Sequence, residues 1–150
     1  MEDTIASKSE YFHRQDRLMS RILPNSLVII PNNRPSIRSN DTKYPYRANS
    51  YILYLSDWQE PNSVLTISNL NAARESTLHV KPRDTEKEIW EGRIIGPDGA
   101  LINWPVDKST SILDFENCLK IELKNHSNSE INFTFTPHLS PMFRGILSTI

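Results

Sequence analysis

The stretch RSNDTKYPYRANSYILYL, residues 38–55, joins a polar segment directly to an apolar run. The polar part passes through Tyr44-Pro45-Tyr46-Arg47 and contains residues that are typical of turns. The apolar part, residues 51–55, is rich in the aromatic and β-branched residues that strands favour. We therefore predict a loop over residues 32–49 that presents side chains to something outside the domain, and a strand over residues 51–55 that holds it.

Towards the N-terminus, the pattern indicates a helix followed by a strand. Ser7 and Glu10 have the spacing of a capping box, and Leu18 and Ile22 then lie on one helical face. The continuous apolar run at residues 27–30 predicts a central strand that is covered on both faces.

Towards the C-terminus, short strands and helices alternate. Residues 64–67 form the next predicted strand, and their short distance from residues 51–55 favours an antiparallel hairpin between the two. Residues 68–75 are expected to form a loop. The remaining predicted elements are a strand at residues 77–80, a helix from Thr85 closed by Gly92, a turn at residues 96–99, a helix from Ser111 and a half-buried strand at residues 130–136.

Together these segments predict an α/β fold, a single domain with a mixed, partly antiparallel sheet flanked by helices. We place the domain at residues 1–128 and treat residues 129–150 as a divergent C-terminal tail.

Length and composition fit one globular domain, since the chain has 150 residues, of which 37% are hydrophobic and 23% charged. The formal net charge of −1 gives no global field that would attract nucleic acid or an anionic membrane. No apolar run approaches the ~20 residues that a membrane helix needs. The acidic N-terminus does not have the pattern of a signal peptide. We therefore expect a cytoplasmic protein without membrane contact.

The sequence offers no catalytic or metal-binding motif. None of the four His has a second His or a carboxylate at the helical spacing of a zinc motif. Cys118 lies on the apolar face of a predicted helix, where cysteine behaves as a small hydrophobic residue. With four Gly, the chain has neither a Gly-x-Ser-x-Gly elbow nor a glycine-rich phosphate loop. We predict no catalytic and no metal-binding residues, and therefore an inactive chain.

The predicted loop concentrates basic and aromatic residues, which are Arg34, Arg38, Lys43 and Arg47, with Tyr44 and Tyr46 among them. Basic residues interleaved with aromatic ones can bind single-stranded nucleic acid. The alternative is that the tyrosines pack, while the arginines bond loop carbonyls and nearby carboxylates, such as Glu86, Glu88 and Glu91. The near-zero net charge argues against nucleic acid as the partner.

Trp90 is the second candidate for a site. It lies in the predicted short helix, flanked by Glu88, Glu91 and Arg93. A Trp in this setting either buries its ring in its own core or presents it to a pocket in another chain. The residues alone leave both alternatives open.

Three segments together resemble the N-terminal domain of aminopeptidase P, the Xaa-Pro aminopeptidases related to prolidase and creatinase. In chain order they are YFHRQDRLMSRILPNSLVIIP, RSNDTKYPYRANSYILYLSDWQEPNSVLTI and HVKPRDTEKEIWEGRIIGPDGA. The middle segment is the most specific, because Tyr-Pro-Tyr-Arg-x-Asn-Ser followed by an aromatic-rich strand and Glu-Pro is hard to reach by chance. The resemblance covers roughly residues 11–125.

The resemblance implies a non-catalytic domain of a two-part enzyme. In this family a longer C-terminal "pita-bread" domain holds two metal ions, usually manganese, through two Asp, one His and two Glu. Its signature opens with two Asp separated by ten residues, and no two Asp of this chain have that spacing. Manganese is therefore implied for the full-length family, and we expect this chain to bind no cofactor.

The resemblance also marks two residues as a substrate-pocket wall. Asp41 matches a family aspartate near the substrate site, and Trp90 matches a tryptophan that can reach the pocket of a neighbouring subunit. One departure is Asp57, where the family commonly has Gly. Because Gly adopts positive φ without cost and Asp does so at some cost, we expect the turn to be kept with an altered shape.

Two hypotheses of function follow. The first is a non-catalytic N-terminal domain that contributes oligomer contacts and a pocket wall for proline-containing peptides, with the catalytic domain or other copies of the chain as partners. The second is a free-standing interaction module whose Arg34-to-Arg47 loop binds an acidic peptide or RNA. An excised domain, a split gene and a truncated reading frame all stay open as origins of the chain.

Overall fold

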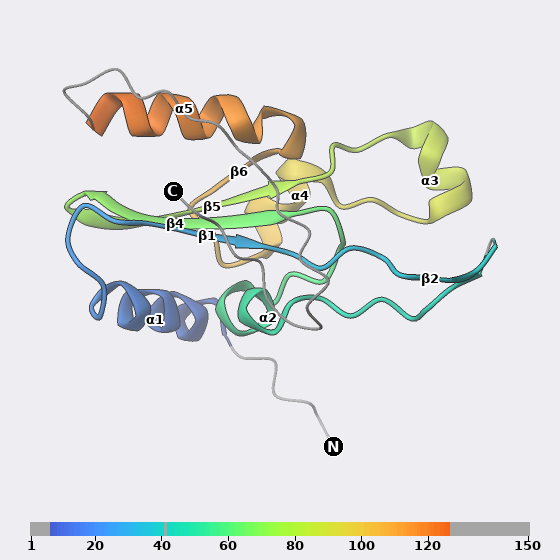
Figure 1. The fold of residues 1–150 in the computed structure, drawn as a ribbon, viewed down its shortest axis with the longest axis horizontal. Coiled ribbons are helices and arrows are strands. Elements are labelled where there is room, and N and C mark those ends of the chain that lie inside the picture. The colour runs from blue at the N-terminus through green and yellow to red at the C-terminus, as the bar shows by residue number, and fades with distance from the viewer. Residues whose placement is uncertain (1–6, 41, 127–150) are drawn as a thin grey trace. The chain divides into compact units, whose positions relative to one another are not determined.

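The computed structural model describes residues 7–40 and 42–126 of the chain (Figure 1). The chain divides into two compact units, Met1–Glu116 and Asn117–Ile150, and each is described by itself. Within the described residues, the α-helices are α1 (Lys8–Met19), α2 (Ser50–Ser56), α3 (Thr85–Glu91), α4 (Gly96–Asn103) and α5 (Phe115–His126), with a 3-10 turn η1 (Ile112–Asp114) before α5. The strands are β1 (Leu27–Pro31), β2 (Ile37–Ser39), β3 (Thr42–Lys43), β4 (Val64–Asn71), β5 (Ala73–Val80) and β6 (Lys108–Ser111).

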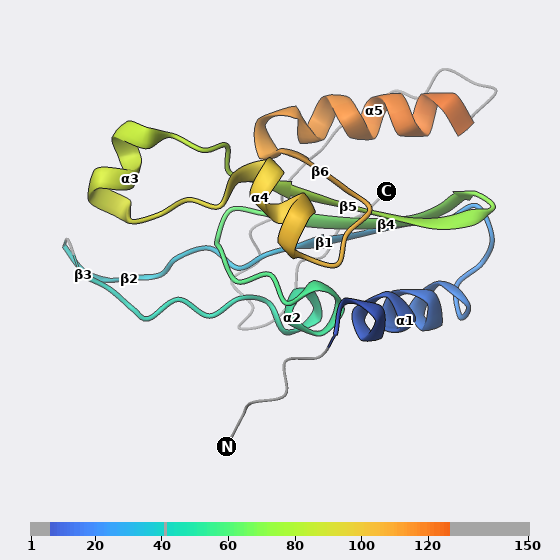
Figure 2. The same ribbon diagram turned by 180° about the vertical axis from the view of Figure 1, so that it is seen from behind.

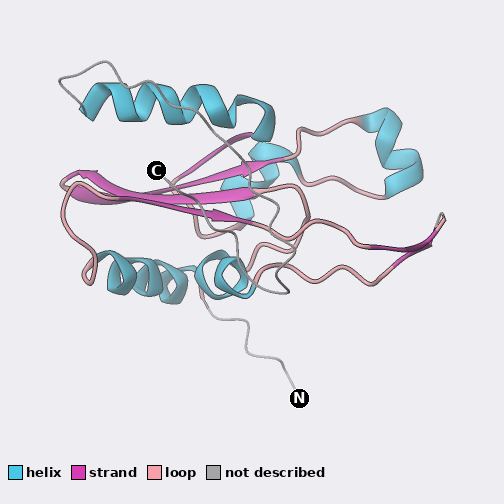
Figure 3. Cartoon of the chain, viewed as in Figure 1, coloured by secondary structure: helices cyan, strands magenta, loops and turns pink. Residues whose placement is uncertain are grey.

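The central sheet of the described residues has the strand order β1-β4-β5-β6 (Figure 3). β1, β4 and β5 pair antiparallel, whereas β6 pairs parallel with β5. A parallel neighbour requires a crossover connection, and residues 81–107, which include α3 and α4, supply it. The predicted α/β class, with a mixed and partly antiparallel sheet flanked by helices, is confirmed.

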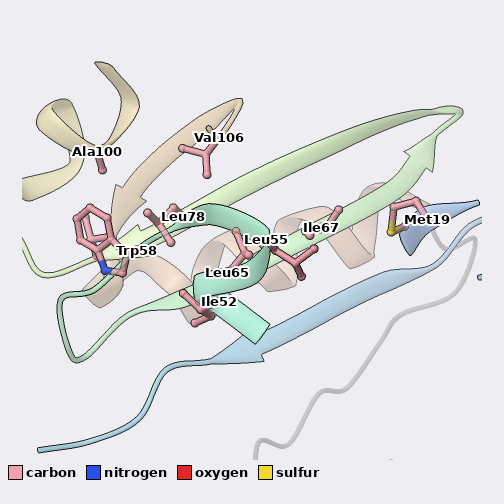
Figure 4. Packing of buried hydrophobic residues seen from close by; sticks show 10 residues of the cluster. Met19, Ile52, Leu55, Trp58, Leu65, Ile67, Leu78, Ala100 and Val106 are labelled. Carbon is pink, nitrogen blue, oxygen red and sulfur yellow. The ribbon is translucent and has the colours of Figure 1, made fainter. Parts of the chain in front are cut away.

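The hydrophobic core lies on the face of the sheet that α1 and α2 cover (Figures 1 and 4). Because side chains alternate along a strand, Leu65 and Ile67 of β4 point to this face together with Leu78 of β5. The helices and connections add the other buried members, which include Met19, Ile52, Leu55, Trp58, Ala100 and Val106. The rings of Trp58 and Trp104 pack edge to face, with 5.0 Å between their centroids.

A buried glutamine fastens α1 to this core. The side chain of Gln15 is fully buried, and its Nε2 donates hydrogen bonds to the carbonyl oxygens of Leu55 and Pro105, both at 2.9 Å. Its Oε1 accepts a hydrogen bond of 2.8 Å from Nη1 of Arg74. Arg74 also forms ion pairs with two carboxylates, those of Asp16 and Asp107. The buried amide is therefore fully satisfied.

The strand predicted over residues 51–55 is wrong, because this segment forms the helix α2. Asn49 caps α2 by accepting a hydrogen bond from the backbone N–H of Tyr51 at 2.9 Å. The buried residues Ile52, Leu55 and Ser56 have helical spacing. α2 ends at Asp57, whose φ of 56° confirms the positive φ expected where the family has Gly. A short apolar run does not by itself distinguish a strand from a helix, and here the capping residue decides.

The strand predicted at residues 27–30 is confirmed as β1, but its predicted central position is wrong, because β1 lies at an edge of the sheet. Val28 and Ile30 pack against the core, while Ile29 points to the opposite face and is 41% exposed. The continuous apolar run therefore reflects one buried face and not two.

The predicted hairpin between residues 51–55 and 64–67 does not form. β4 instead continues to Asn71 and turns back into β5, so the loop expected at residues 68–75 is mostly strand. The turn places Ala72 at a φ of 64°, in the left-handed region. The sequence contains no Gly at this turn, which explains why the hairpin escaped prediction.

The starts of α1 and of the helical segment after Ser111 were predicted correctly. α1 begins directly after Ser7, but the Ser7 side chain makes no capping bond. The turn predicted at residues 96–99 is the first turn of α4, since proline is tolerated there. The helix predicted from Ser111 is confirmed as η1 followed by α5. The strand predicted at residues 130–136 and the domain boundary at residue 128 lie outside the described residues.

Substituting Ala72 by Gly should stabilise the protein. An L-residue in the left-handed region costs about 1–2 kcal/mol relative to its preferred conformation, and Gly does not bear this cost. We expect Ala72→Gly to raise the free energy of unfolding by about 1 kcal/mol, measured by denaturant titration. The control is Ala73→Gly in the adjacent strand, which should lower it by about 0.5–1 kcal/mol. Equal losses in the two variants would contradict the assigned turn.

β5 also carries a buried imidazole on the face opposite the core. Nδ1 of His79 lies 2.7 Å from Oγ1 of Thr110, and Nε2 lies 3.3 Å from Oγ1 of Thr66. The ring meets Phe115 edge to face at 4.9 Å between centroids. Burial lowers the pKa of His79 from 6.5 to about 4.

This lowered pKa predicts a loss of stability in mild acid. Between about pH 4 and 6.5 the unfolded chain binds the His79 proton more tightly, so stability is full above pH 6.5 and falls as pH decreases through this window. The loss reaches about 3 kcal/mol at most. Denaturant titrations at pH 7.5 and 5 should show a smaller pH-dependent loss in His79→Gln than in the parent. Identical losses in both proteins would show that His79 does not titrate in this way.

Candidate functional site

Two segments project from the same end of the central sheet (Figures 1 and 2). We term residues 32–49 the β2–β3 arm and residues 81–95 the α3 arm. β1 and β5 run in the same direction, because both pair antiparallel with β4. Their carboxyl ends therefore meet at one end of the sheet, and the two arms begin there.

Asn32 closes the β2–β3 arm at its root. Its Oδ1 accepts hydrogen bonds from the backbone N–H groups of Asn33 and Asn49, at 2.9 and 2.8 Å. Its Nδ2 donates to the carbonyl oxygen of Glu60 and to Oγ of Ser63, at 2.9 and 3.0 Å. One buried amide thus joins the first and last residues of the arm and ties them to the turn before β4.

Glu60 connects this root to the root of the α3 arm. Its backbone carbonyl accepts the bond from Asn32, and its Oε1 accepts a hydrogen bond of 3.1 Å from the backbone N–H of Ile95. Burial raises the pKa of the Glu60 carboxyl, while the bond from Ile95 and the charge of Lys81 oppose this shift. Both arms are therefore fixed by one residue where they meet the sheet.

Polar contacts also fix the helix of the α3 arm. Oδ1 of Asp84 accepts from the backbone N–H groups of Glu86 and Lys87, which makes Asp84 the N-cap of α3. Oε1 of Glu88 accepts from Nε of Arg83 at 2.9 Å, and this bond lowers the pKa of Glu88. The helix from Thr85 closed by Gly92 is confirmed, and its N-cap is Asp84.

The fixed arms leave large apolar side chains exposed. On α3, Trp90 is 89% exposed and Ile89 is 76% exposed. On the β2–β3 arm, Ile37 and Tyr44 are exposed as well. Single exposed apolar residues are common on proteins. Here, however, they lie on segments whose roots are tied down, which makes them available to another surface.

The β2–β3 arm also presents its basic and aromatic residues at the surface. The guanidinium of Arg38 lies over the ring of Tyr44, 6.0 Å from its centroid. The hydroxyl of Tyr46 donates to the carbonyl oxygen of Asn33 at 3.0 Å, and burial raises its pKa. An open depression of about 460 Å³ lies among these side chains, lined by Asn33, Arg34, Ser36, Tyr44, Pro45, Tyr46 and Arg47.

The structure thus brings some of the predicted site residues together. Tyr44, Tyr46 and Arg47 line one depression, and Arg38 covers Tyr44 from outside. Trp90 stands apart from them on the α3 arm with its ring exposed, as a presented side chain requires. Asp41 lies outside the described residues. The pocket-wall roles of Asp41 and Trp90 stay predictions.

Sequence reasoning did not find Asn32 and Glu60, which position both arms. Their signals are weak, because an Asn after a predicted strand and a Glu before Pro61 also occur in ordinary turns. Their role depends on bonds between residues far apart in the chain, and the sequence alone does not show these bonds.

The described residues offer no ligand set for the manganese that the resemblance implies, because no three His, Cys, Asp or Glu side chains converge among them. Cys118 is a free, half-buried thiol. In the same part of the chain, no helix is long and apolar enough to cross a membrane. Two expectations stay predictions. One is that this chain binds no cofactor, and the other is that the protein is cytoplasmic.

Comparison with known proteins shows the family. The family model described as "Aminopeptidase P, N-terminal domain" matches residues 11–131. The chain therefore belongs to this family, and the resemblance found in the sequence is confirmed.

The relatives are much longer than the chain. An Xaa-Pro aminopeptidase of Haemophilus influenzae is 32% identical over 118 residues, which cover 79% of this chain and 27% of the relative. Intermediate cleaving peptidase 55 of Saccharomyces cerevisiae is 34% identical over 116 residues, which cover 75% of this chain and 23% of the relative. The structure of Escherichia coli aminopeptidase P with the inhibitor Pro-Leu has a TM-score of 0.75 at 30% identity, with 80% of this chain and 28% of that chain covered. The chain thus spans about a quarter of the length of these proteins.

Removing the Asn32 amide should loosen the β2–β3 arm. Asn32→Ala leaves several partly buried polar groups without hydrogen-bond partners. Each such group that water does not reach costs about 1–3 kcal/mol of folding free energy. We expect a loss of about 2–4 kcal/mol in unfolding free energy and faster hydrogen exchange at the backbone N–H of Asn49.

The matched control for this variant is Asn32→Asp. The carboxylate keeps the acceptor for Asn33 and Asn49 but loses the donor to Glu60 and Ser63. Protection of the Asn49 N–H should therefore survive in Asn32→Asp. If Asn32→Ala preserves that protection equally well, Asn32 does not close the arm.

Proposed function

We propose that this domain forms one wall of a pocket for proline-containing peptides, and that a catalytic domain or another copy of the chain completes the pocket. The observation that carries the proposal is the 89% exposed Trp90 on a helix fixed by Asp84 and Glu88. An aromatic ring that is held in place but not packed in its own core supplies a large rigid surface for a ligand.

The relatives support the substrate class. Several are named Xaa-Pro aminopeptidases, and one related structure is described with the inhibitor Pro-Leu. Most of each relative extends beyond the part matched here. The catalytic groups, with the manganese that the resemblance implies, are therefore proposed to lie in that other part, and the described residues supply positioning without catalysis.

Two finer roles belong to the same proposal. Asp41 is proposed as a second residue of the wall, on the basis of its match to a family aspartate. Oligomer contacts are proposed for the exposed apolar side chains of the two arms, because monomers rarely leave contiguous apolar patches beyond a few hundred Å².

A chimera tests the wall. In the Haemophilus influenzae relative, the segment aligned with residues 11–131 is replaced by these residues, and hydrolysis of an Xaa-Pro peptide is measured. We expect Trp90→Ala in the chimera to raise KM about tenfold or more, because a buried aromatic contact contributes about 1.5–3 kcal/mol. The matched control is Ile102→Ala on α4, also exposed at 70%, which should leave KM unchanged. The isolated 150-residue chain should show no hydrolysis with or without added manganese.

A stability measurement separates this role from simple packing. Trp90→Ala should lower the unfolding free energy by well under about 1 kcal/mol, whereas Trp58→Ala, fully buried, should cost about 3–5 kcal/mol. A Trp90 loss as large as that of Trp58, or equal KM changes for Trp90 and Ile102, would remove the wall assignment. Phe115 and Leu53 are only half-buried and serve less well as references.

A further inference from the structure

The β2–β3 arm carries a local surplus of positive charge. Residues 34–47 contain four basic residues and one acidic residue, a surplus of three positive charges in a chain whose formal net charge is −1. The basic residues, all exposed, are Arg34, Arg38, Lys43 and Arg47. Within the described part of the chain, none of the four forms an ion pair.

Two carboxylates of the α3 arm are already paired within that arm. Glu88 pairs with Arg83, and Asp84 pairs with Lys87, so these acidic groups are used within their own arm. These two carboxylates therefore do not satisfy the arginines of the β2–β3 arm. The arm keeps cations that can accept a carboxylate from outside.

The depression on the arm is suited to such a group. Its volume of about 460 Å³ lies between Arg34, Tyr44, Tyr46 and Arg47. Nη2 of Arg47 donates to Oγ of Ser50 at 3.2 Å, which leaves most of its five N–H donors available. A guanidinium binds a carboxylate through two parallel hydrogen bonds, and two guanidiniums beside one depression can hold adjacent acidic side chains.

The same residues are poorly placed to bind nucleic acid. Sequence-tolerant binding of a single strand requires open aromatic faces on which bases stack. Arg38 lies over the ring of Tyr44, and Tyr46 is half-buried with its hydroxyl bonded to the carbonyl oxygen of Asn33.

We propose that the β2–β3 arm binds acidic peptide segments, with Arg34 and Arg47 holding carboxylates at the depression between them. This binding rests on the unpaired charges of the arm and not on the pocket-wall role of Trp90. The closed root at Asn32 holds the two arginines in one segment, which reduces the ordering that binding requires.

The test measures binding of a fluorescent hexaglutamate peptide to the full chain by anisotropy at low salt. We expect Arg34→Gln/Arg47→Gln to weaken binding about tenfold or more, because the double variant loses two charge-assisted hydrogen-bonded pairs with the peptide carboxylates. The matched control is Arg17→Gln/Arg21→Gln, which removes the same charge from exposed positions beyond the arm. It should weaken binding less than about twofold, and Trp90→Ala should have no effect.

The outcomes separate the possibilities. Equal weakening by the two double variants would show unspecific attraction and overturn the proposal, as would no binding of hexaglutamate at low salt. Tighter binding of a 12-nucleotide single-stranded DNA than of hexaglutamate, lost in the arm variant, would assign the arm to nucleic acid instead. If the double variant fails to fold, Arg34→Gln alone decides, because the Arg34 side chain is exposed and has no bond to the rest of the described chain.

Discussion

The fold depends on one buried amide, that of Gln15. α1 reaches the core through three bonds of this side chain, to the end of α2, to the connection before β6 and to Arg74 of β5. An amide buried without partners costs more free energy than its bonds return, so the helix, the sheet and the crossover connection must be in place together. The bonds of this amide, together with the packing of Met19, define the position of α1.

The positions of the two arms follow from this arrangement. Arg74 extends the amide contact to Asp16 and Asp107, which join α1 and the start of β6 to β5. The carboxyl ends of β1 and β5 lie at one end of the sheet because both strands pair antiparallel with β4. At that end, the side chains of Asn32 and Glu60 form hydrogen bonds with backbone groups of the two arms, as the side chain of Gln15 does with backbone carbonyls in the core.

The sequence predicts the class of the fold and the family, because apolar periodicity and the Tyr-Pro-Tyr-Arg segment are local signals. It does not predict α2 as a helix, since Tyr51, Ile52 and Tyr54 favour strands and seven residues carry little periodic information. It predicts a central strand at residues 27–30 because they are apolar throughout, although strand order depends on partners distant in the chain. The exposure of Trp90 is compatible with the residues around it, but only the fold shows that nothing else in the described chain covers the ring.

The closed root of the β2–β3 arm separates sequence changes within the arm from sequence changes in the core of the domain. Oδ1 of Asn32 accepts hydrogen bonds from the backbone N–H groups of both Asn33 and Asn49, so the two ends of the arm are held together at the sheet. The entropy of closing such a segment rises by only about 0.6 kcal/mol when its length doubles. Insertions and deletions within residues 34–47 therefore change the free energy of closing the arm only slightly, and evolution can alter what the arm recognises without redesigning the domain that carries it.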